Sequence, residues 1–158
     1  MVILTIIAIL NCKPCFSGCN STEYEINGQC CSMCQPGNRV YWHCSEDATT
    51  TCVPCLASTY MDKPNQLTKC MPCTVCKGNQ TLKTKQACAN SSDTVCGPLE
   101  GFYCINQNQK GSCRLAVKHS TCRPGQYINQ TGTEFSDTVC DDCPAESCSD
   151  GLCILNTK

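Results

Sequence analysis

The chain has 158 residues, 21 of which are cysteines, and its formal net charge at pH 7 is −1. Cysteine at this density is typical of small extracellular domains that are stabilised by disulfide bonds instead of a large apolar core. Positive and negative charges are interspersed, which argues against a nucleic-acid or membrane-surface partner.

The chain begins with an apolar run, MVILTIIAIL, over residues 1–10. This run has the length of a signal-peptide core and is too short to span a bilayer, so we predict a leader over residues 1–18, cleaved near Ser17 or Gly18. No basic residue precedes the run, which means that the leader is weak or that its start lies upstream. We therefore expect a secreted chain, or the cell-surface part of a longer protein.

The remainder of the chain contains repeats. Residues 33–52 and 121–140 both carry Cys-x-Pro-Gly near their start and end on a cysteine 18 positions after the first one. A third copy covers residues 75–96, and its final SDTVC recurs at residues 136–140. With the cysteine pair that precedes each complete copy, the repeating unit has about 40 residues and six cysteines, as in other stacked repeats of this length.

One difference between the copies indicates how the cysteines pair. Cys31 and Cys44 of the first copy correspond to His119 and Gly132 of the last copy, so two cysteines are lost together. The simplest explanation is that these two positions are bonded to each other, because a single orphaned thiol is reactive in an oxidising compartment. The third cysteine of a unit therefore pairs with the fifth, the fourth with the sixth, and the first with the second.

This rule predicts eight disulfides and the repeat boundaries. The disulfides are Cys19–Cys30, Cys31–Cys44, Cys34–Cys52, Cys55–Cys70, Cys73–Cys88, Cys76–Cys96, Cys104–Cys113 and Cys122–Cys140. The repeats are repeat one (residues 19–52), repeat two (55–96), repeat three (97–140, with one bridge lost) and a partial fourth repeat (143–158). The rule leaves the pairing of Cys143, Cys148 and Cys153 open, and the leader would remove Cys12 and Cys15.

The segments between cysteines are rich in Gly, Pro, Asn, Ser and Thr, which favour turns, and no helical periodicity is present. We therefore predict a small disulfide-rich fold, an elongated rod of stacked cysteine-rich repeats with short β-ribbons and little helix. One such ribbon is expected around residues 39–42. Tyr24 and Tyr60, each five residues after the first cysteine of a unit, are expected to pack over their bridges, whereas packing and binding are equally plausible for Trp42.

Metal and catalytic sites are disfavoured by the sequence. Cys31, Cys34, Cys52 and Cys55 have zinc-type spacing, but zinc needs reduced thiols and leaves the other cysteines of the unit unexplained. An iron–sulfur run that starts at Cys70-x2-Cys73-x2-Cys76 has no fourth cysteine. The only histidines, His43 and His119, are expected at the surface and belong to no catalytic set. We expect no enzyme activity, no cofactor and no metal.

Four Asn-x-Ser/Thr sequons are candidate glycosylation sites in a secreted chain. They are Asn20, Asn79, Asn90 and Asn129.

The cysteine pattern resembles the repeats of the tumour necrosis factor receptor superfamily over residues 19–153. The resemblance is carried by CMPCTVC, by the adjacent cysteines of GQCCSMC, by the SDTVC unit ends and by the Cys-x2-Cys unit junctions. It implies an extracellular rod that lies in the groove between subunits of a trimeric cytokine ligand and acts in immune regulation, as a receptor or as a soluble decoy. A purely structural disulfide-rich module is the alternative.

The resemblance also implies where partners bind. In this superfamily the second and third repeats usually carry the ligand contacts, which here correspond to Tyr60, Met61, Asp62, Lys63, Asn65, Gln66, Leu67, Lys77, Lys83, Lys85, Phe102, Tyr103, Gln107 and Lys110. One member of the superfamily also binds immunoglobulin-fold partners through an exposed strand of its first repeat. That strand corresponds to Asn38, Arg39, Val40, Tyr41 and Trp42.

Overall fold

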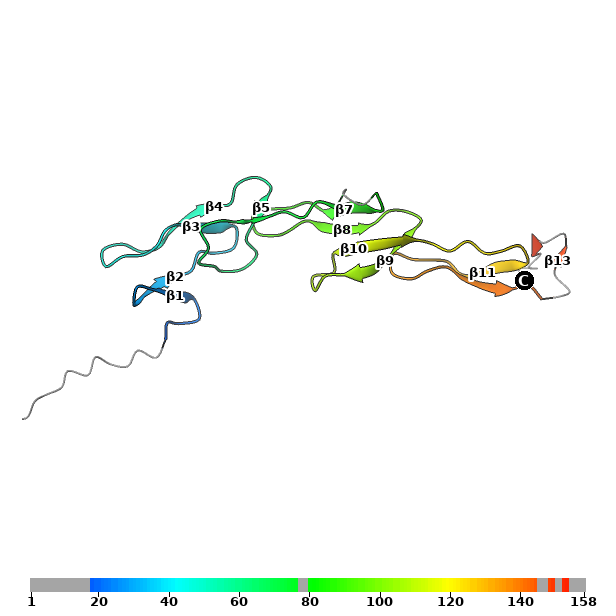
Figure 1. The fold of residues 1–158 in the computed structure, drawn as a ribbon, viewed down its shortest axis with the longest axis horizontal. Coiled ribbons are helices and arrows are strands. Elements are labelled where there is room, and N and C mark those ends of the chain that lie inside the picture. The colour runs from blue at the N-terminus through cyan, green and yellow to red at the C-terminus, as the bar shows by residue number, and fades with distance from the viewer. Residues whose placement is uncertain (1–17, 77–79, 145–147, 150–151, 154–158) are drawn as a thin grey trace, which may run out of the picture.

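The computed structural model of the chain describes residues 18–76, 80–144, 148–149 and 152–153, so the predicted leader lies almost wholly outside it. This part of the chain is an elongated rod built from seven two-stranded antiparallel ribbons (Figure 1). None of the described residues belongs to a helix long and apolar enough to cross a membrane. The predicted fold class is confirmed.

The ribbons follow one another along the chain. Repeat one contains β1 (Glu23–Ile26) with β2 (Gln29–Ser32), and β3 (Asn38–Trp42) with β4 (Thr51–Pro54). Repeat two contains β5 (Thr59–Tyr60) with β6 (Met71–Pro72), and β7 (Leu82–Gln86) with β8 (Val95–Pro98). Repeat three contains β9 (Phe102–Gln107) with β10 (Cys113–Lys118), and β11 (Gln126–Gln130) with β12 (Val139–Asp142). Beyond it, β13 (Cys148–Ser149) pairs with β14 (Leu152–Cys153).

Local sequence sets the first ribbon. β1 and β2 are joined by the two residues Asn27 and Gly28, whose φ angles are 51° and 78°. Asn-Gly is the preferred pair for such a turn, because both central residues must adopt positive φ for the turn to match the twist of the two strands. Tyr24 of β1 is buried opposite Cys31 of β2, as expected from its place in the repeat.

The cysteines are joined as the repeat comparison predicts. The structure contains Cys19–Cys30, Cys31–Cys44, Cys34–Cys52, Cys55–Cys70, Cys73–Cys88, Cys76–Cys96, Cys104–Cys113 and Cys122–Cys140. Cys143 is also disulfide-bonded, and the side chains of Cys148 and Cys153 lie outside the described part. The four cysteines with zinc-type spacing are all used in disulfides and have no thiolate to offer a metal.

Half-cystines make up most of the interior. Of the twelve buried apolar residues in the described chain, seven are half-cystines, and the others are Tyr24, Val40, Met61, Leu82 and Ala116. An interior this small cannot offset the conformational entropy of the chain. Disulfides restrict the unfolded chain and each typically contribute about 2–5 kcal/mol in domains of this kind.

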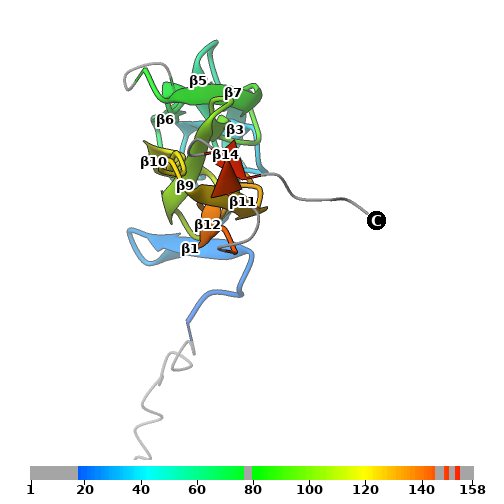
Figure 2. The same cartoon turned by 90° about the vertical axis from the view of Figure 1, so that its right-hand side faces the viewer.

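Neighbouring repeats share part of this interior. Cys76, Leu82 and Cys96 of repeat two form one buried cluster with Cys104, Cys113 and Ala116 of repeat three, and Phe102 packs against it. The main-chain N–H of Cys96 donates to the Ser112 hydroxyl at 2.8 Å, across the same junction. Figure 2 shows the rod end-on, with the ribbons of successive repeats one behind another.

The repeated SDTVC sequence has a structural explanation that spacing alone did not reveal. Asp137 accepts hydrogen bonds from the main chain and hydroxyl of Ser120, at 2.7 and 2.5 Å, and from the N–H of Thr138 at 2.7 Å. Asp93 of repeat two makes the same three contacts with Thr74 and Thr94. We call this arrangement the aspartate clamp. In repeats two and three it ties the end of the repeat to Thr74 and Ser120, the residues that follow Cys73 and His119.

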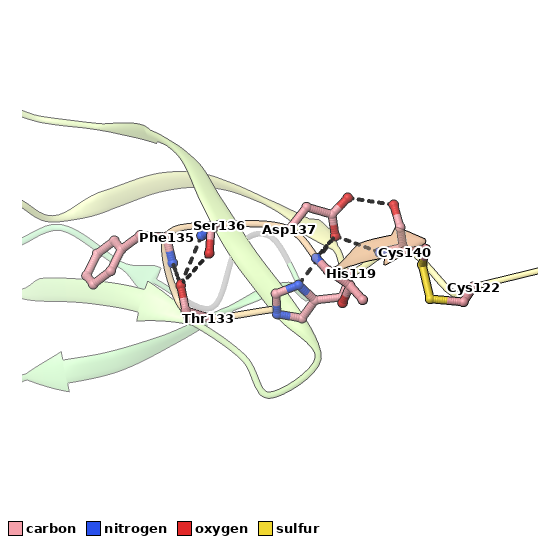
Figure 3. A network of polar contacts seen from close by, with 9 residues as sticks. His119, Cys122, Thr133, Phe135, Ser136, Asp137 and Cys140 are labelled. Carbon is pink, nitrogen blue, oxygen red and sulfur yellow. Dashed lines mark hydrogen bonds and ion pairs between the residues drawn. A yellow bond between two sulfur atoms is a disulfide. The ribbon is translucent and has the colours of Figure 1, made fainter. Parts of the chain in front are cut away.

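In repeat three a histidine fills the place of the missing bridge. The imidazole of His119 stacks on the Tyr103 ring, with centroids 5.4 Å apart. Its Nδ1 lies 3.5 Å from the Asp137 carboxylate (Figure 3). A Cβ atom on Gly132 would lie 2.2 Å from that Nδ1, so only glycine leaves room for the ring. The expectation that both histidines are surface residues is therefore wrong for His119, whose side chain is only 19% exposed. His43 is exposed and shares a 2.8 Å hydrogen bond with the Tyr24 hydroxyl.

The double substitution His119→Cys with Gly132→Cys should restore the lost bridge. Positions 119 and 132 are 13 residues apart, as are Cys31 and Cys44. We expect the new bridge to raise the thermal midpoint under non-reducing conditions by roughly 5–15 °C, measured by circular dichroism and checked by non-reducing peptide mapping. Free thiols at both positions, or an unchanged midpoint despite the new bond, would contradict the repeat alignment.

Gly132→Ala alone should destabilise the chain, because the new methyl group displaces the His119 ring. A cost of about 1–3 kcal/mol is typical of such overpacking. The same substitution in a His119→Ala background is the matched control and should cost much less, since the ring is gone. If Gly132→Ala lowers the free energy of unfolding equally in both backgrounds, the His119 ring is not what requires glycine at position 132.

The aspartate clamp predicts a specific acid sensitivity. Donors from Ser120, first its hydroxyl and then its main chain, lower the pKa of Asp137 to about 2 from its usual value of 3.8. A depressed pKa means that the stabilisation is present above about pH 4 and is lost as the pH falls toward 2. Asp137→Asn should therefore lower the thermal midpoint at pH 7, and the gap to the unmodified chain should close over that window. Asp47→Asn, at an exposed position in repeat one, should show no such closure; a gap for Asp137→Asn that persists at pH 2 would exclude the clamp as its source.

Candidate functional site

A hollow of about 850 Å³ lies where repeats two and three meet. Tyr60 lines one side of it, from the first loop of repeat two, and Gln107 and Lys110 line the other, from the β9–β10 hairpin. All three are predicted ligand-contact residues, and Tyr60 is far from Gln107 and Lys110 in the sequence. The fold thus brings candidate residues from two repeats onto one surface, which we call the junction surface.

The hairpin tip is fastened to repeat two by Lys110. Its ammonium group forms an ion pair with Asp62 and lies 6.0 Å from the centre of the Tyr60 ring. Within the tip, the Asn108 side chain accepts hydrogen bonds from the main chains of Lys110 and Ser112, both at 2.9 Å. The ion pair links the two repeats beside the hollow, and the Asn108 hydrogen bonds shape the hairpin tip that carries Lys110.

Asp93 controls the electrostatics of the hollow on the repeat-two side. Partial burial opposes ionisation of its carboxyl, but the donors of the aspartate clamp, led by the Thr74 hydroxyl, outweigh it and hold the pKa of Asp93 below its usual range. Burial, with the adjacent Asp93 charge, raises the pKa of Tyr60. At neutral pH the hollow therefore contains an ionised carboxylate with satisfied hydrogen bonds and a neutral phenol.

Other predicted contact residues lie away from the hollow, beside repeat one. Asn65, Gln66 and Leu67 belong to a segment that runs along the outer edge of β3. The Asn65 amide donates to the Asn38 carbonyl at 2.9 Å, and the Leu67 carbonyl accepts from the Val40 N–H at 2.8 Å. Gln66 and Leu67 are exposed, as is Lys63, which precedes them.

Met61 does not fit the prediction of a contact residue. Its side chain is only 2% exposed, and its main chain bonds to Gly37 of repeat one and to Asn90 of repeat two. Met61 thus packs inside the junction between repeats one and two, and its side chain is not available to a partner.

The remaining predicted contacts are distributed over repeats two and three. Lys83 and Lys85 lie on β7, and Lys85 pairs with Glu134 of repeat three at 2.6 Å, which lowers the pKa of Glu134. Phe102 packs on the shared core, and Tyr103 stacks on His119. Lys77 lies outside the described residues, as does the Asn79 sequon.

The predicted coreceptor strand coincides with β3, but its main-chain edges are already used. One edge pairs with β4, and on the other edge Val40 and Asn38 bond to the segment that contains Leu67 and Asn65. What β3 offers to a partner is its aromatic end. Tyr41 and Trp42 are 52% and 65% exposed and form an edge-to-face pair with ring centres 5.1 Å apart.

Several residues of the hollow were not predicted from the sequence. Thr74, Asp93 and Arg114 line it along with Tyr60. The recurrence of SDTVC was a usable signal for Asp93. Nothing in the sequence marked Arg114, since its place opposite repeat two depends on how the β9–β10 hairpin folds back.

One group of side chains in the described chain has the spacing of a metal site. Potential ligand atoms of Cys73, Cys88 and Asp93 lie within 4.8 Å of one another. The two sulfurs are bonded to each other, so they have no lone thiolate to donate, and this group does not suit a metal ion.

The sequence of the chain is similar to a known family of proteins. A family model described as the TNFR/NGFR cysteine-rich region matches residues 55–96 and 99–140. The chain is 40% identical to tumor necrosis factor receptor superfamily member 14 of Mus musculus, over 89% of this chain and 50% of that protein. It is 33% identical to the tumor necrosis factor soluble receptor of Rabbit fibroma virus (strain Kasza), over 85% of this chain and 40% of that protein. The chain thus spans about half the length, or less, of these relatives.

Solved structures share the rod architecture. A chain from a structural and biochemical study of equine lentivirus receptor 1 is similar with a TM-score of 0.61 and 34% identity, covering 64% of this chain and 98% of that one. A chain in the crystal structure of the mouse RANKL–OPG complex has a TM-score of 0.56 and 31% identity, covering 84% of this chain and 97% of that one.

The ion pair that fastens the hairpin tip can be tested by a double-mutant cycle. Asp62→Asn and Lys110→Gln should each lower the free energy of unfolding in urea. The two effects together should be smaller than their sum by about 0.5–1 kcal/mol, the usual coupling of a partly exposed pair. The coupling should shrink in 1 M NaCl because the charges are screened. Strict additivity at low salt would mean that the pair does not fasten the tip.

Proposed function

The chain belongs to the tumour necrosis factor receptor family, and from this premise we propose that it binds a trimeric ligand of the tumour necrosis factor family outside the cell. It acts there as a receptor ectodomain or as a soluble decoy in immune regulation. Binding occurs by surface complementarity, without an enzymatic step and without a cofactor.

The observation that carries this proposal is the convergence of two repeats on the junction surface. Tyr60 and Lys110 come from different repeats and face one hollow, fixed by the Asp62 ion pair. A rigid surface with an aromatic side chain and polar groups is suited to protein recognition, since little ordering entropy is lost on binding. The similarity to a chain of the RANKL–OPG complex supports this class of ligand.

Charge at the junction surface indicates what the ligand must present there. Lys110 is neutralised by Asp62, and the Asp93 carboxylate is satisfied by the aspartate clamp. Arg114 lines the same hollow, and among the described residues no carboxylate forms an ion pair with it. A guanidinium binds a carboxylate through two parallel hydrogen bonds, so we infer that the ligand contributes an acidic side chain at this point.

A receptor and a soluble decoy differ in whether the extracellular rod is attached to a membrane span and a signalling tail. One relative supports the decoy role. The rabbit fibroma virus relative is named as a soluble receptor. It supports the decoy as a role that this fold can perform. A purely structural extracellular module remains the alternative, and it predicts no binding to any trimeric cytokine.

An immunoglobulin-fold coreceptor is a second candidate partner, and the exposed pair of Tyr41 and Trp42 favours it. Because the segment around Leu67 covers the free edge of β3, such a partner would bind these aromatic side chains in place of adding a strand. This candidate surface belongs to repeat one, so both partners could be bound at once.

The test is binding of the chain, secreted from mammalian cells, to a panel of trimeric tumour necrosis factor family ligands by surface plasmon resonance. We expect saturable binding to at least one ligand with about three chains per trimer. Arg114→Glu should weaken that binding by at least about tenfold, as loss of a central contact does. Arg114→Lys keeps the positive charge but cannot form the two parallel hydrogen bonds of a guanidinium. It should have a smaller effect than Arg114→Glu.

Two controls make the result interpretable. Trp42→Ala should leave trimer binding unchanged and abolish binding to an immunoglobulin-fold partner, if one is found. Asp47→Asn should affect neither. A chain that is folded and fully oxidised but binds no trimer would overturn the proposal and leave the structural module.

A further inference from the structure

The sequon at Asn90 occupies the tip of a tight turn. Ala89 and Ser92 exchange two main-chain hydrogen bonds, both 3.0 Å long, and Asn90 and Ser91 form the two residues between them. Asn90 is exposed. The turn lies beside repeat one, because a Cβ atom on Gly37 would be 3.7 Å from the Cβ atoms of Asn90 and Ser91. Asn90 itself stays exposed, so a bulky group can be attached to it.

The amide of Asn90 is also free, unlike the amides of the other described sequons. The Nδ2 of Asn20 donates to Glu23 at 3.1 Å, and the Nδ2 of Asn129 donates to Asp141 at 2.7 Å. The Asn90 side chain makes no hydrogen bond within the described part of the chain. A sugar on Asn90 therefore breaks no side-chain hydrogen bond of the described structure.

The turn lies against the loop that carries the predicted ligand contacts. The Asn90 carbonyl accepts from the Met61 N–H at 2.8 Å, between Tyr60 and Asp62. Ser92, the last residue of the sequon, lines a small hollow together with Asp62 and Lys110. The turn therefore lies between Gly37 of repeat one and the Asp62–Lys110 contact, so a group on Asn90 flanks the junction surface from its repeat-one side and stays outside its main hollow.

The matching turn of repeat three shows which way this position points. There Thr133 and Ser136 close the turn (Figure 3). Glu134 follows Thr133 in the chain and holds the place of Asn90. The Glu134 carbonyl accepts from the Cys104 N–H, as that of Asn90 does from Met61, and its side chain reaches Lys85 in the preceding repeat. A side chain at this turn position therefore extends across a repeat junction toward the preceding repeat.

We propose that Asn90 carries an N-linked glycan that flanks the junction surface and slows the approach of the ligand from that side. Nδ2 forms a bond to the anomeric carbon of a polyprenyl-diphosphate-linked oligosaccharide. The bond between that carbon and the diphosphate oxygen breaks, the polyprenyl diphosphate leaves, and Nδ2 loses one proton. The effect on binding rests on the proposed function, whereas the modification itself does not.

Occupancy is measured on the chain secreted from mammalian cells. Peptide-N-glycosidase F treatment in ¹⁸O-water converts a glycosylated asparagine to labelled aspartate, which peptide mass spectrometry locates. We expect label at position 90 in the unmodified chain and in Ser91→Ala, which keeps the sequon. Label should be absent from Asn90→Gln and from Ser92→Ala, two independent ways to remove it. An unlabelled position 90 in the unmodified chain overturns the proposal.

The consequence is measured with the trimeric ligand that binds best in the panel. Asn90→Gln and Ser92→Ala should each raise the association rate constant about two- to fivefold, with little change in dissociation, because a shield at the edge affects encounter more than the bound contacts. Ser91→Ala should match the unmodified chain. Equal association rates for all four proteins would refute the shielding. If no form binds any trimer but position 90 is labelled, the proposed function is wrong, while the proposal that Asn90 is glycosylated is confirmed.

Discussion

Disulfide bonds do the work of an apolar core in this chain, and the placing of every loop follows from them. Eight bonds, besides the one that Cys143 makes, are spread along the described rod, and the half-cystines themselves are the majority of its buried apolar residues. Since the bonds fix the chain at short intervals, few side chains in the loops between them need to be buried, and Met61 is an exception. The loops are free to carry exposed residues such as Lys63 and Gln66, which is the arrangement expected of a binding scaffold.

Repeat three shows how a unit tolerates the loss of one bond. The aspartate clamp at Asp137 is retained, and the space of the bridge is taken by the His119 ring over Gly132, stacked on Tyr103. The replacement is non-covalent, so it does not restrict the unfolded chain as a disulfide does. Packing against repeat two offsets part of the lost stabilisation, because Cys104 and Cys113 of repeat three share one buried cluster with residues of repeat two. Stability in such a rod is thus shared between adjacent units.

Much of this fold could be predicted from the sequence, because the disulfide bonds are its main constraint and their pairing follows from the cysteine spacing. The joint loss of two cysteines gave the pairing rule, and the strand at Asn38–Trp42 lies where a ribbon was expected. The contacts between repeats could not be predicted. That Met61 is buried, that Leu67 covers the edge of β3 and that Arg114 faces the hollow all depend on how one unit sits on the next. Such contacts join distant positions and leave no periodic signal in one sequence.

The central claim is that ligand is bound at the junction of repeats two and three. Hydrogen–deuterium exchange of the secreted chain, with and without a saturating trimeric ligand, tests it most directly, because it locates the bound surface without altering any residue. The claim predicts slower exchange in residues 58–63 and 105–114, with no change in residues 38–42. Protection confined to repeat one, or absent despite saturable binding, would contradict it.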